Sequence, residues 1–473
     1  MCKRVFVLLC ATALVGCNMA PKYVRPTLPT PTNYVAQHQT GGQLAERVGW
    51  EQFFGDPQLK VYLAAALANN RNMAAATARI AQARAQFRIQ NGARLPQLDG
   101  NASGTRTRTP LGSLGFGDAL GGDGAASSVT SNQYAVQVAV SSFELDFWGR
   151  VRNLSEAARH QYLATVEAER AFRLSLISDV AATYYSIRAG EEGIALAERT
   201  VASRRQGLEI AKLRLDAGVT SSVDYDQAAL LVTQANTELA DLHRTTEQRR
   251  NQLLVLVGGP VAGALPPGKP IDDAGQFEAL DPGLPSALLG NRPDVLQAEQ
   301  QLLAANANIG AARAAFFPTI SLTGAFGFAS PELDGLFKSA SQSWSFGGGL
   351  NLPLFDWGKR EGQLGIARAQ RDELVATYQF TLQNAFREVS DALVGRQRYR
   401  EQIRALEEAV AAQRRLAETA QLRYDNGIAI YLEVLDAQRN LFSAEQQLIL
   451  LRATELQNGV SLYTALGGGL DGR

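Results

Sequence analysis

The sequence is poor in the residues on which several classes of protein depend. Its 473 residues include only 3 Cys and 3 His, and His38, His160 and His243 lie far apart in the chain. No cysteines and histidines have the spacing of a metal site, and no glycine-rich phosphate loop follows a strand pattern. The 46 Lys+Arg are balanced by 46 Asp+Glu, whereas nucleic-acid binding needs a basic surplus. We therefore expect no enzyme, no resident cofactor or metal, and no nucleic-acid partner.

Proline is also scarce, and its distribution is informative. Ten of the 17 prolines lie in 21–31 and 260–285, and none lies in 151–259 or 354–473. Since a proline costs a helix interior roughly 3 kcal/mol, these two stretches leave room for unusually long helices. No run of about 18 apolar residues follows the N-terminal segment, which excludes membrane-spanning helices. If the protein crosses a membrane, it must do so with strands.

The N-terminus has the pattern of an export signal. Lys3 and Arg4 precede a short apolar run, which is followed by the sequence Leu14-Val15-Gly16-Cys17. Because the apolar run is too short to cross a bilayer, residues 1–16 are predicted to be a cleaved signal peptide.

The end of this signal resembles the lipobox of bacterial lipoproteins. The resemblance implies that Cys17 is diacylated and becomes the mature N-terminus, so that a covalent lipid is the only added group. Asn18, in place of the aspartate of the inner-membrane retention signal, implies the outer membrane. The alternative is an ordinary secretory signal that contains a cysteine. We expect residues 17–56, which begin with several prolines, to form an extended lipidated tether.

The chain contains two copies of one pattern. Shifting it by 209 residues superposes more than a hundred residues without a gap, as continuous helices require. The superposed residues include Trp148-Gly149-Arg150 with Trp357-Gly358-Lys359, Leu213-Arg214 with Leu422-Arg423, Gly218 with Gly427, and Gly258-Gly259 with Gly467-Gly468. The protein is therefore a tandem duplication.

Upstream of these positions the offset changes. Pro96 matches Pro318 at an offset of 222, so the first copy holds 13 more residues, which the glycine-rich stretch 110–128 accommodates. We predict repeats over 57–259 and 291–468, a proline-rich crossover linker over 260–290, and a C-terminal tail over 469–473.

Each repeat has the same predicted order of parts. A medium helix, two strands, a very long helix and a return helix follow one another, over about 57–93, 97–146, 150–217 and up to 257 in the first copy, and over about 291–315, 319–353, 358–426 and up to 466 in the second. A long helix of this size spans roughly 100 Å. Apolar residues at helical spacing predict antiparallel coiled-coil packing of the long helices.

The strands of the second repeat alternate between apolar and small or polar residues. The apolar positions are Ile320, Leu322, Phe326 and Phe328, then Trp344, Phe346, Leu350 and Leu352. This is typical of transmembrane barrel strands, and a soluble hairpin on a helical bundle is the alternative. The strand after Pro96 alternates poorly. Four strands cannot close a barrel, so several chains must share one: two would give eight strands and three would give twelve.

The residues that open the second repeat resemble a family signature. They are Asn291-Arg292-Pro293-Asp294-Val295, Ala298-Glu299, Leu302, Ala304-Ala305-Asn306-Ala307, Ile309-Gly310, Ala312-Arg313 and Phe316-Phe317-Pro318-Thr319-Ile320-Ser321-Leu322. They are similar to the NodT-type efflux lipoproteins of the TolC-like outer-membrane factors, and the junctions at Trp148 and Trp357 match that family too.

The resemblance implies a mainly α fold with a small β part. In a homotrimer, four strands per chain would form a shared 12-stranded outer-membrane barrel, and the long antiparallel hairpins would form a helical tunnel in the periplasm of a Gram-negative bacterium. It implies an exit duct that works with a periplasmic adaptor and an inner-membrane transporter, most often of the resistance-nodulation-division type.

The resemblance also places a gate at the turns between the long helices. Glu433 and Asp436 match acidic rings that narrow the entrance, and Tyr424 and Asp224 match members of a polar network that holds it closed. The family's gating arginine falls at Ala429, so Arg423 or Arg214 is the candidate substitute. The alternative for Glu433 and Asp436 is a solvated helix face.

The resemblance also assigns the residues of these turns to a docking surface. Gly218 and Gly427 are expected to adopt positive φ, and with Arg214 and Arg423 they form the helix tips at which an adaptor would dock. Two other functions are consistent with parts of the sequence: a periplasmic coiled-coil scaffold lipoprotein, and the same duct serving type I protein secretion.

Overall fold

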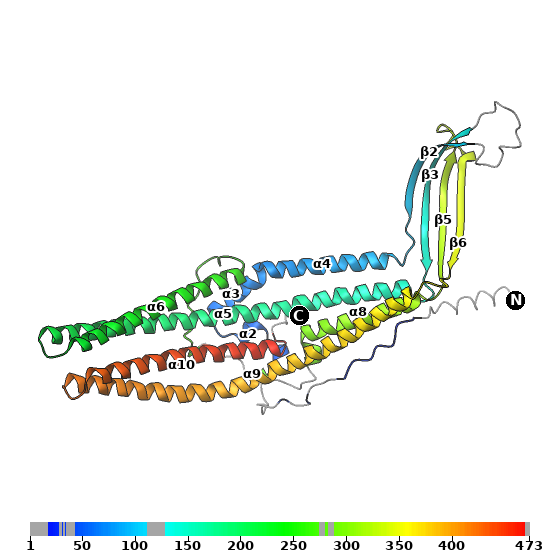
Figure 1. Ribbon diagram of the computed structural model, residues 1–473. Helices are drawn as coiled ribbons and strands as arrows, with labels where there is room; N and C mark the ends of the chain where they lie inside the picture. The colour runs from blue at the N-terminus through cyan, green and yellow to red at the C-terminus, as the bar shows by residue number, and fades with distance from the viewer. Residues whose placement is uncertain are drawn as a thin grey trace, which may run out of the picture. The chain divides into compact units, whose positions relative to one another are not determined.

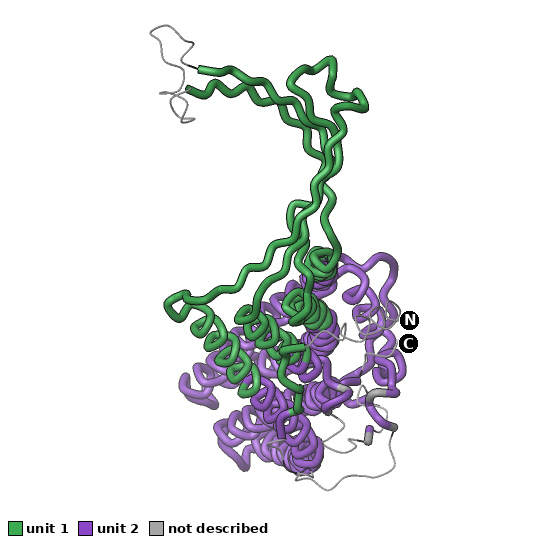
Figure 2. The backbone as a smooth tube through the Cα atoms, turned by 90° about the vertical axis from the view of Figure 1, so that its right-hand side faces the viewer, with its two compact units in different colours: residues 1–25, 82–163, 300–376 green, residues 26–81, 164–299, 377–473 purple. Residues whose placement is uncertain are grey.

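The computed structural model describes residues 18–27, 31, 34, 43–110, 128–273, 280–281 and 288–468. The predicted signal peptide, Cys17 and the C-terminal tail lie outside these ranges. The described chain forms two compact units (Figure 2). Unit 1 is drawn from 1–25, 82–163 and 300–376, and unit 2 from 26–81, 164–299 and 377–473. Each repeat contributes to both units, because its long helix runs from one unit into the other.

Unit 1 contains a four-stranded antiparallel sheet in the order β2-β3-β5-β6 (Figure 1). Its strands are β2 (Asp99–Pro110), β3 (Ser128–Leu145), β5 (Thr319–Ser330) and β6 (Gln342–Asn351). The central pair, β3 with β5, joins the two repeats, and its register shifts at a bulge between Val140 and Phe143. Within the described residues β2 and β6 pair on one side only, so the sheet has two open edges.

One face of this sheet is apolar and exposed. Phe326 on β5 lies opposite Val138 on β3 and Trp344 on β6, as the predicted alternation requires. The side chains of Trp344, Phe346 and Leu350 are 76%, 74% and 67% exposed. An exposed apolar face of this kind marks a surface that another protein or a membrane covers.

The N-terminal segment is docked on unit 1. The Asn306 side-chain amide of α8 (Pro293–Ala314) donates to the Pro21 carbonyl at 2.8 Å, and Arg313 Nη1 donates to the Met19 carbonyl at 3.4 Å. A Cβ on Gly310 would lie 2.8 Å from the Ala20 backbone, so glycine is needed for this approach. Three residues of the predicted family signature therefore hold the start of the tether against a helix.

Four long helices dominate the chain. They are α5 (Arg150–Asp216), α6 (Ser222–Val257), α9 (Lys359–Asp425) and α10 (Tyr431–Ala465), which confirms the two predicted hairpins. None of the described helices combines the length and the hydropathy of a membrane-crossing segment.

The first helix of each repeat is broken, which the sequence analysis did not predict. The first copy has α3 (Pro57–Asn69) and α4 (Arg71–Gly92) around Asn70, and the second has α7 (Leu288–Asn291) and α8 around Arg292. Asn70 ends α3 with extended backbone, and its side chain accepts from the Met73 amide at 2.9 Å as an N-cap. In the second copy, Pro293 disfavours helical backbone at the residue before it.

The expectation that 17–56 is wholly a tether is wrong for its second half. β1 (Gln43–Leu44) pairs with β4 (Leu280–Asp281), and η1 (Ala45–Arg47) and α2 (Trp50–Phe53) follow. In the core of unit 2 the Phe53 ring stacks on Tyr463 with centroids 4.0 Å apart, and Tyr463 donates to the Val48 carbonyl at 2.6 Å. The aromatic pair at Phe53 and Phe54, which are both fully buried, was the signal for a packed segment.

Candidate functional site at the helix turns

The two helix turns have the same backbone geometry. Gly218 and Gly427 both have φ of 72°, as predicted from their residue type. The residue after each glycine donates to the carbonyl of the equivalent arginine: Val219 to Arg214 at 3.0 Å and Ile428 to Arg423 at 2.8 Å. These bonds satisfy carbonyls at the helix end, as C-terminal capping motifs do.

A small apolar cluster joins the two hairpins near these turns. We call it the tip cluster; its members are Ala211, Ala228, Leu231, Tyr424, Tyr431, Val434 and Leu435. The rings of Tyr424 and Tyr431 lie 4.9 Å apart, and the Arg214 guanidinium lies over the Tyr424 ring at 4.2 Å. Two predicted gate residues, Tyr424 and Arg214, are therefore in direct contact through a cation–π interaction.

Asp224 lies beside the same cluster. Thr220 donates its hydroxyl hydrogen to the Asp224 carboxylate. Burial raises the pKa of Tyr431, and the nearby Tyr424 and the negative charge of Asp224 raise it further. The sequence analysis missed Tyr431, because its role depends on a contact between hairpins that are distant in the chain.

The predicted acidic residues lie on the exposed side of α10. Glu433 pairs with Arg423 across the turn at 3.4 Å, and Asp436 pairs with Arg439 on its own helix at 2.9 Å. The Glu433 and Asp436 side chains are 45% and 52% exposed. Their role in a constriction depends on further chains and stays a prediction.

A hollow of about 760 Å³ adjoins the tip cluster. Arg204 lies in its wall and is buried, with Nη1 donating to the Leu231 carbonyl at 3.0 Å and the guanidinium 5.5 Å from the Phe442 ring. Within the described part of the chain its Nε has no hydrogen-bond partner, and burial lowers its pKa. Nothing in the sequence marked Arg204, since it is one of many arginines on a long helix.

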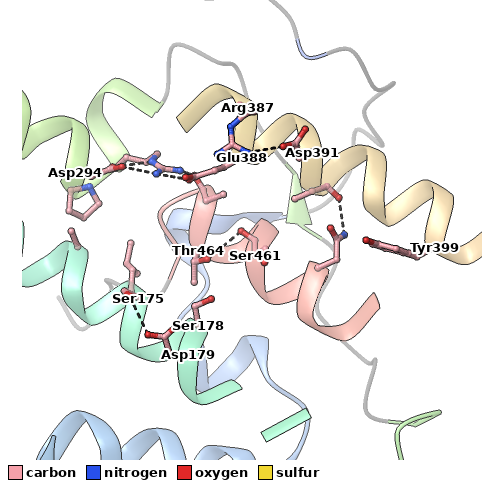
Figure 3. A pocket seen from close by; sticks show the side chains of 17 residues that line it. Ser175, Ser178, Asp179, Asp294, Arg387, Glu388, Asp391, Tyr399, Ser461 and Thr464 are labelled. Atoms are coloured by element: carbon pink, nitrogen blue, oxygen red, sulfur yellow. Dashed lines mark hydrogen bonds and ion pairs between the residues drawn. The ribbon is translucent and has the colours of Figure 1, made fainter. Parts of the chain in front are cut away.

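A second hollow, of about 580 Å³, lies among α5, α8, α9 and α10 (Figure 3). Arg292 is its central cation: it forms ion pairs with Asp294 at 2.7 Å and Glu388 at 2.8 Å, and Nη1 donates to the Ala465 carbonyl at 3.0 Å. Burial lowers the pKa of Arg292, but Asp294 and Glu388 outweigh burial and raise it above its usual value. Asp179 faces the same hollow and accepts from Ser175 at 3.4 Å.

Neither hollow presents a metal centre. No group of three or more His, Cys, Asp or Glu residues with metal-binding geometry occurs in the ranges that the structure describes. The residues around the two hollows form ion pairs and ring contacts that fix the positions of the long helices.

The chain is similar over its whole length to outer-membrane efflux proteins. Residues 62–259 and 284–468 match the family model described as outer membrane efflux protein. The chain is 43% identical over 462 residues to the solvent efflux pump outer membrane protein SrpC of Pseudomonas putida, covering 96% of each. It is 39% identical over 469 residues to the outer membrane protein OprJ of Pseudomonas aeruginosa, covering 99% of this chain and 96% of OprJ.

A solved structure agrees with this relationship. The open state of the MtrE outer membrane channel of Neisseria gonorrhoeae matches with a TM-score of 0.86 at 35% identity, covering 96% of this chain and 99% of MtrE. The fold, with its sheet and its long helical hairpins, is thus that of the outer-membrane channels that act in efflux. The chain belongs to the outer membrane efflux protein family.

Proposed function

We propose that this chain forms the exit duct of a tripartite efflux system as a homotrimer. Three copies would close a shared 12-stranded barrel in the outer membrane, and their long hairpins would line a periplasmic tunnel. Small organic molecules would pass through the duct when it is docked to a periplasmic adaptor and an inner-membrane transporter, most often of the resistance-nodulation-division type.

The sheet is the observation that carries this proposal. Within the described residues the sheet has two open edges and one exposed apolar face, which suits neither solvent: water leaves the face uncovered, and lipid leaves the backbone groups of the edges unpaired. Closure with further strands removes the edges, and lipid covers the face.

The helix turns support the docking part of the proposal. Gly218 and Gly427 turn the chain at the ends of both hairpins next to the tip cluster, and the carbonyls of Arg214 and Arg423 accept the bonds that close these turns. An adaptor that binds at these tips would act on the contacts that hold the hairpins together. Glu433 and Asp436 of three chains would supply six carboxylates to a cation-attracting constriction.

A lipid on Cys17 is the remaining part of the proposal. Residues 19 and 21 of the tether are bonded to α8, so a lipid on Cys17 would be held close to unit 1. A mass spectrum of the purified protein should show the acyl mass in the wild type and lose it in Cys17→Ala. A wild-type spectrum without added acyl mass contradicts the anchor.

Planar bilayers test the duct. Purified protein should insert as a trimer and conduct, and removal of the gene should sensitise the cell to small organic toxicants that wild-type cells expel. A soluble monomer that never conducts would favour a periplasmic scaffold lipoprotein. Conduction with unchanged toxicant resistance and lost secretion of a protein would favour a type I secretion duct.

A further inference from the structure

The hollow beside the tip cluster, which we call the tip hollow, holds a buried cation without a counter-ion. Arg204 of α5 lines this hollow and is only 6% exposed. In the part of the chain that the structure describes, no carboxylate lies within ion-pair distance of its guanidinium, and its Nε has no hydrogen-bond partner. Because a buried charge costs free energy until it is paired, this site is incomplete in the protein alone.

The duplicated hairpin does not require a charge at this position. Shifting the chain by 209 residues places Arg204 on Gln413, so the second long helix has a neutral side chain at the equivalent place. The single bond that Arg204 makes, from Nη1 to the Leu231 carbonyl, needs one donor, which an amide group also supplies. The positive charge of Arg204 is therefore not explained by the architecture of the hairpin.

The tip hollow has the size and the walls of a small-molecule site. Its volume of about 760 Å³ lies in the usual range of such sites, and all its walls belong to unit 2. Gly207 leaves space on the α5 side, where a Cβ would lie 2.9 Å from the Tyr431 hydroxyl oxygen. The apolar side chains of the lining come from α5, α9 and α10, and they include Leu196, Ile210, Leu422, Leu441 and Phe442.

The other charges of the lining leave an excess of positive charge. Glu445 is neutralised by Arg414 at 2.6 Å. Arg199 and Glu418 are both exposed, and neither forms an ion pair within the described residues. Two unpaired arginines, Arg199 and Arg204, thus face one unpaired carboxylate, and of these three groups only Arg204 is buried. The hollow therefore favours an anion with a single charge.

We infer that the tip hollow binds an amphipathic monocarboxylate, a small molecule with one carboxylate and an apolar body. The carboxylate accepts hydrogen bonds from the Arg204 guanidinium, whose geometry suits a carboxylate. The apolar body lies against Leu441 and Phe442, and the Phe442 ring is already 5.5 Å from the guanidinium carbon. A dianion fits less well, because its second charge would be buried without a partner.

Such a ligand would contact both hairpins at once. Arg204 belongs to α5 of the first hairpin, and Leu441 and Phe442 belong to α10 of the second. Because the ligand binds only where the hairpins meet, it should raise the melting temperature of the folded protein. The inference goes beyond the proposed duct, since binding and melting are measured without any conduction.

Phenylbutyrate is a suitable probe, and phenylbutanol is its neutral counterpart with the same apolar body. We expect saturable binding of phenylbutyrate to the full-length protein in detergent, with a Kd of about 1 mM or tighter. A ligand-observed NMR titration measures it, with protein-free detergent as the blank. Phenylbutanol should bind about tenfold more weakly, because it cannot form a charge-assisted hydrogen bond with Arg204.

Arg204→Gln is the decisive variant, since it introduces the residue that the second repeat already has. It should weaken phenylbutyrate binding about tenfold or more and abolish the rise in melting temperature. Arg205→Gln is the matched control. Arg205 is the next residue on α5, contacts Asn236 at 3.4 Å and does not line the hollow, so its loss should leave binding unchanged.

A second pair of variants tests the hollow while Arg204 stays in place. Ser203 is an exposed residue of the lining, so Ser203→Phe fills the hollow and should abolish saturable binding. Ala202→Phe adds the same ring to an exposed neighbour outside the lining and should bind as the wild type does. This pair decides the question even if Arg204→Gln does not fold.

The contrary results are clear. Equal affinity for phenylbutyrate and phenylbutanol, unchanged binding in Arg204→Gln or in Ser203→Phe, or a wild-type signal no greater than the detergent blank each overturns the site. The outcome is also separate from that of the duct. A conducting trimer that does not bind phenylbutyrate leaves the proposed function standing, and a protein that binds it at Arg204 without conducting leaves this site standing.

Discussion

In both repeats the first helix is interrupted at equivalent positions, Asn70 and Arg292. The two side chains differ, but each donates a hydrogen bond to an equivalent backbone carbonyl. Asn70 donates to the carbonyl of Leu256 at 2.8 Å, and Arg292 donates to the carbonyl of Ala465 at 3.0 Å. Leu256 and Ala465 are equivalent residues near the ends of the return helices. The duplicated geometry thus requires a donor at this position, because carbonyls at a helix end need partners.

The difference lies in what surrounds the donor. Arg292 also pairs with Asp294 and Glu388, whereas Asp179, the first-repeat equivalent of Glu388, accepts only from Ser175 among the bonds found at its carboxylate. Burial raises the pKa of Asp179. One repeat therefore uses a neutral hydrogen bond where the other uses an ion network, and removing the two donors should have unequal costs.

The largest effect is expected for Arg292→Ala. This change removes a buried guanidinium together with its two ion pairs and its bond to the Ala465 carbonyl, and because Asp294 and Glu388 are 37% and 43% exposed and stay hydrated, we expect a loss of about 2–3 kcal/mol. Asn70→Ala is the matched control and should cost about 1–2 kcal/mol, as the loss of a helix cap does. Urea unfolding midpoints of both variants in detergent measure the difference. Equal shifts would mean that the ion pairs of Arg292 contribute no stability beyond its hydrogen bond to the helix end.

A pH effect is expected at two buried tyrosines of the first repeat whose second-repeat equivalents cannot ionise. Burial raises the pKa of Tyr184 and Tyr185, and their equivalents in the second repeat are Leu393 and Val394, which do not ionise. Since the unfolded tyrosines ionise near pH 10 and the folded ones only above it, the stability from each is complete below about pH 10. It then falls by about 1.4 kcal/mol per pH unit as the pH rises.

Tyr184→Phe tests this expectation. Unfolding midpoints between pH 8 and pH 11 should fall less steeply in the variant than in the wild type. The variant should also lose some stability at pH 8, because Tyr184 donates to the Asp56 carboxylate at 2.7 Å. Parallel curves for wild type and variant would show that the alkaline loss arises elsewhere.

The helix tips offer a comparison of two equivalent carboxylates. Glu433 corresponds to Asp224, but Glu433 is exposed while Asp224 bonds to Thr220 beside the tip cluster. Glu433→Gln with Asp436→Asn should weaken channel block by multivalent cations about tenfold, or about 1.4 kcal/mol. Asp224→Asn should leave block nearly unchanged. Block that persists in the double variant would assign Glu433 and Asp436 to a solvated helix face.

The smallest effect separates the two candidate gating arginines. Arg214 lies over the Tyr424 ring, an interaction worth about 1 kcal/mol, whereas the exposed pair of Arg423 and Glu433 is worth less. Single-channel recordings should show a longer open time by about fivefold for Arg214→Gln, and by less than about twofold for Arg423→Gln. The reverse order would make Arg423 the substitute for the arginine that is absent at Ala429.

The features that could be predicted from the sequence lie in the part of the duplication that aligns without gaps. The long helices and the turns at Gly218 and Gly427 follow from proline-free periodic stretches and from a residue type that tolerates positive φ. Both are local properties, so no knowledge of the tertiary fold was needed.

Contacts between distant segments were not predictable in this way. Arg204 and Tyr431 matter only because two hairpins meet. Asn306 and Arg313 were recognised as part of a signature, but their partners are backbone carbonyls of the tether, which carry no residue-type signal. Residue types alone leave such pairings undetermined.

The two sheet edges that stay open within the described residues also limit how long the single folded chain can exist without pairing wrongly. An open edge pairs with whatever strand it meets first, and its exposure begins as soon as the sheet has formed. Association of several copies depends on their concentration, whereas exposure of an edge does not. A slow supply of chains therefore lengthens the interval in which a wrong strand can pair, and the yield of assembled channel should rise more steeply than the rate of synthesis.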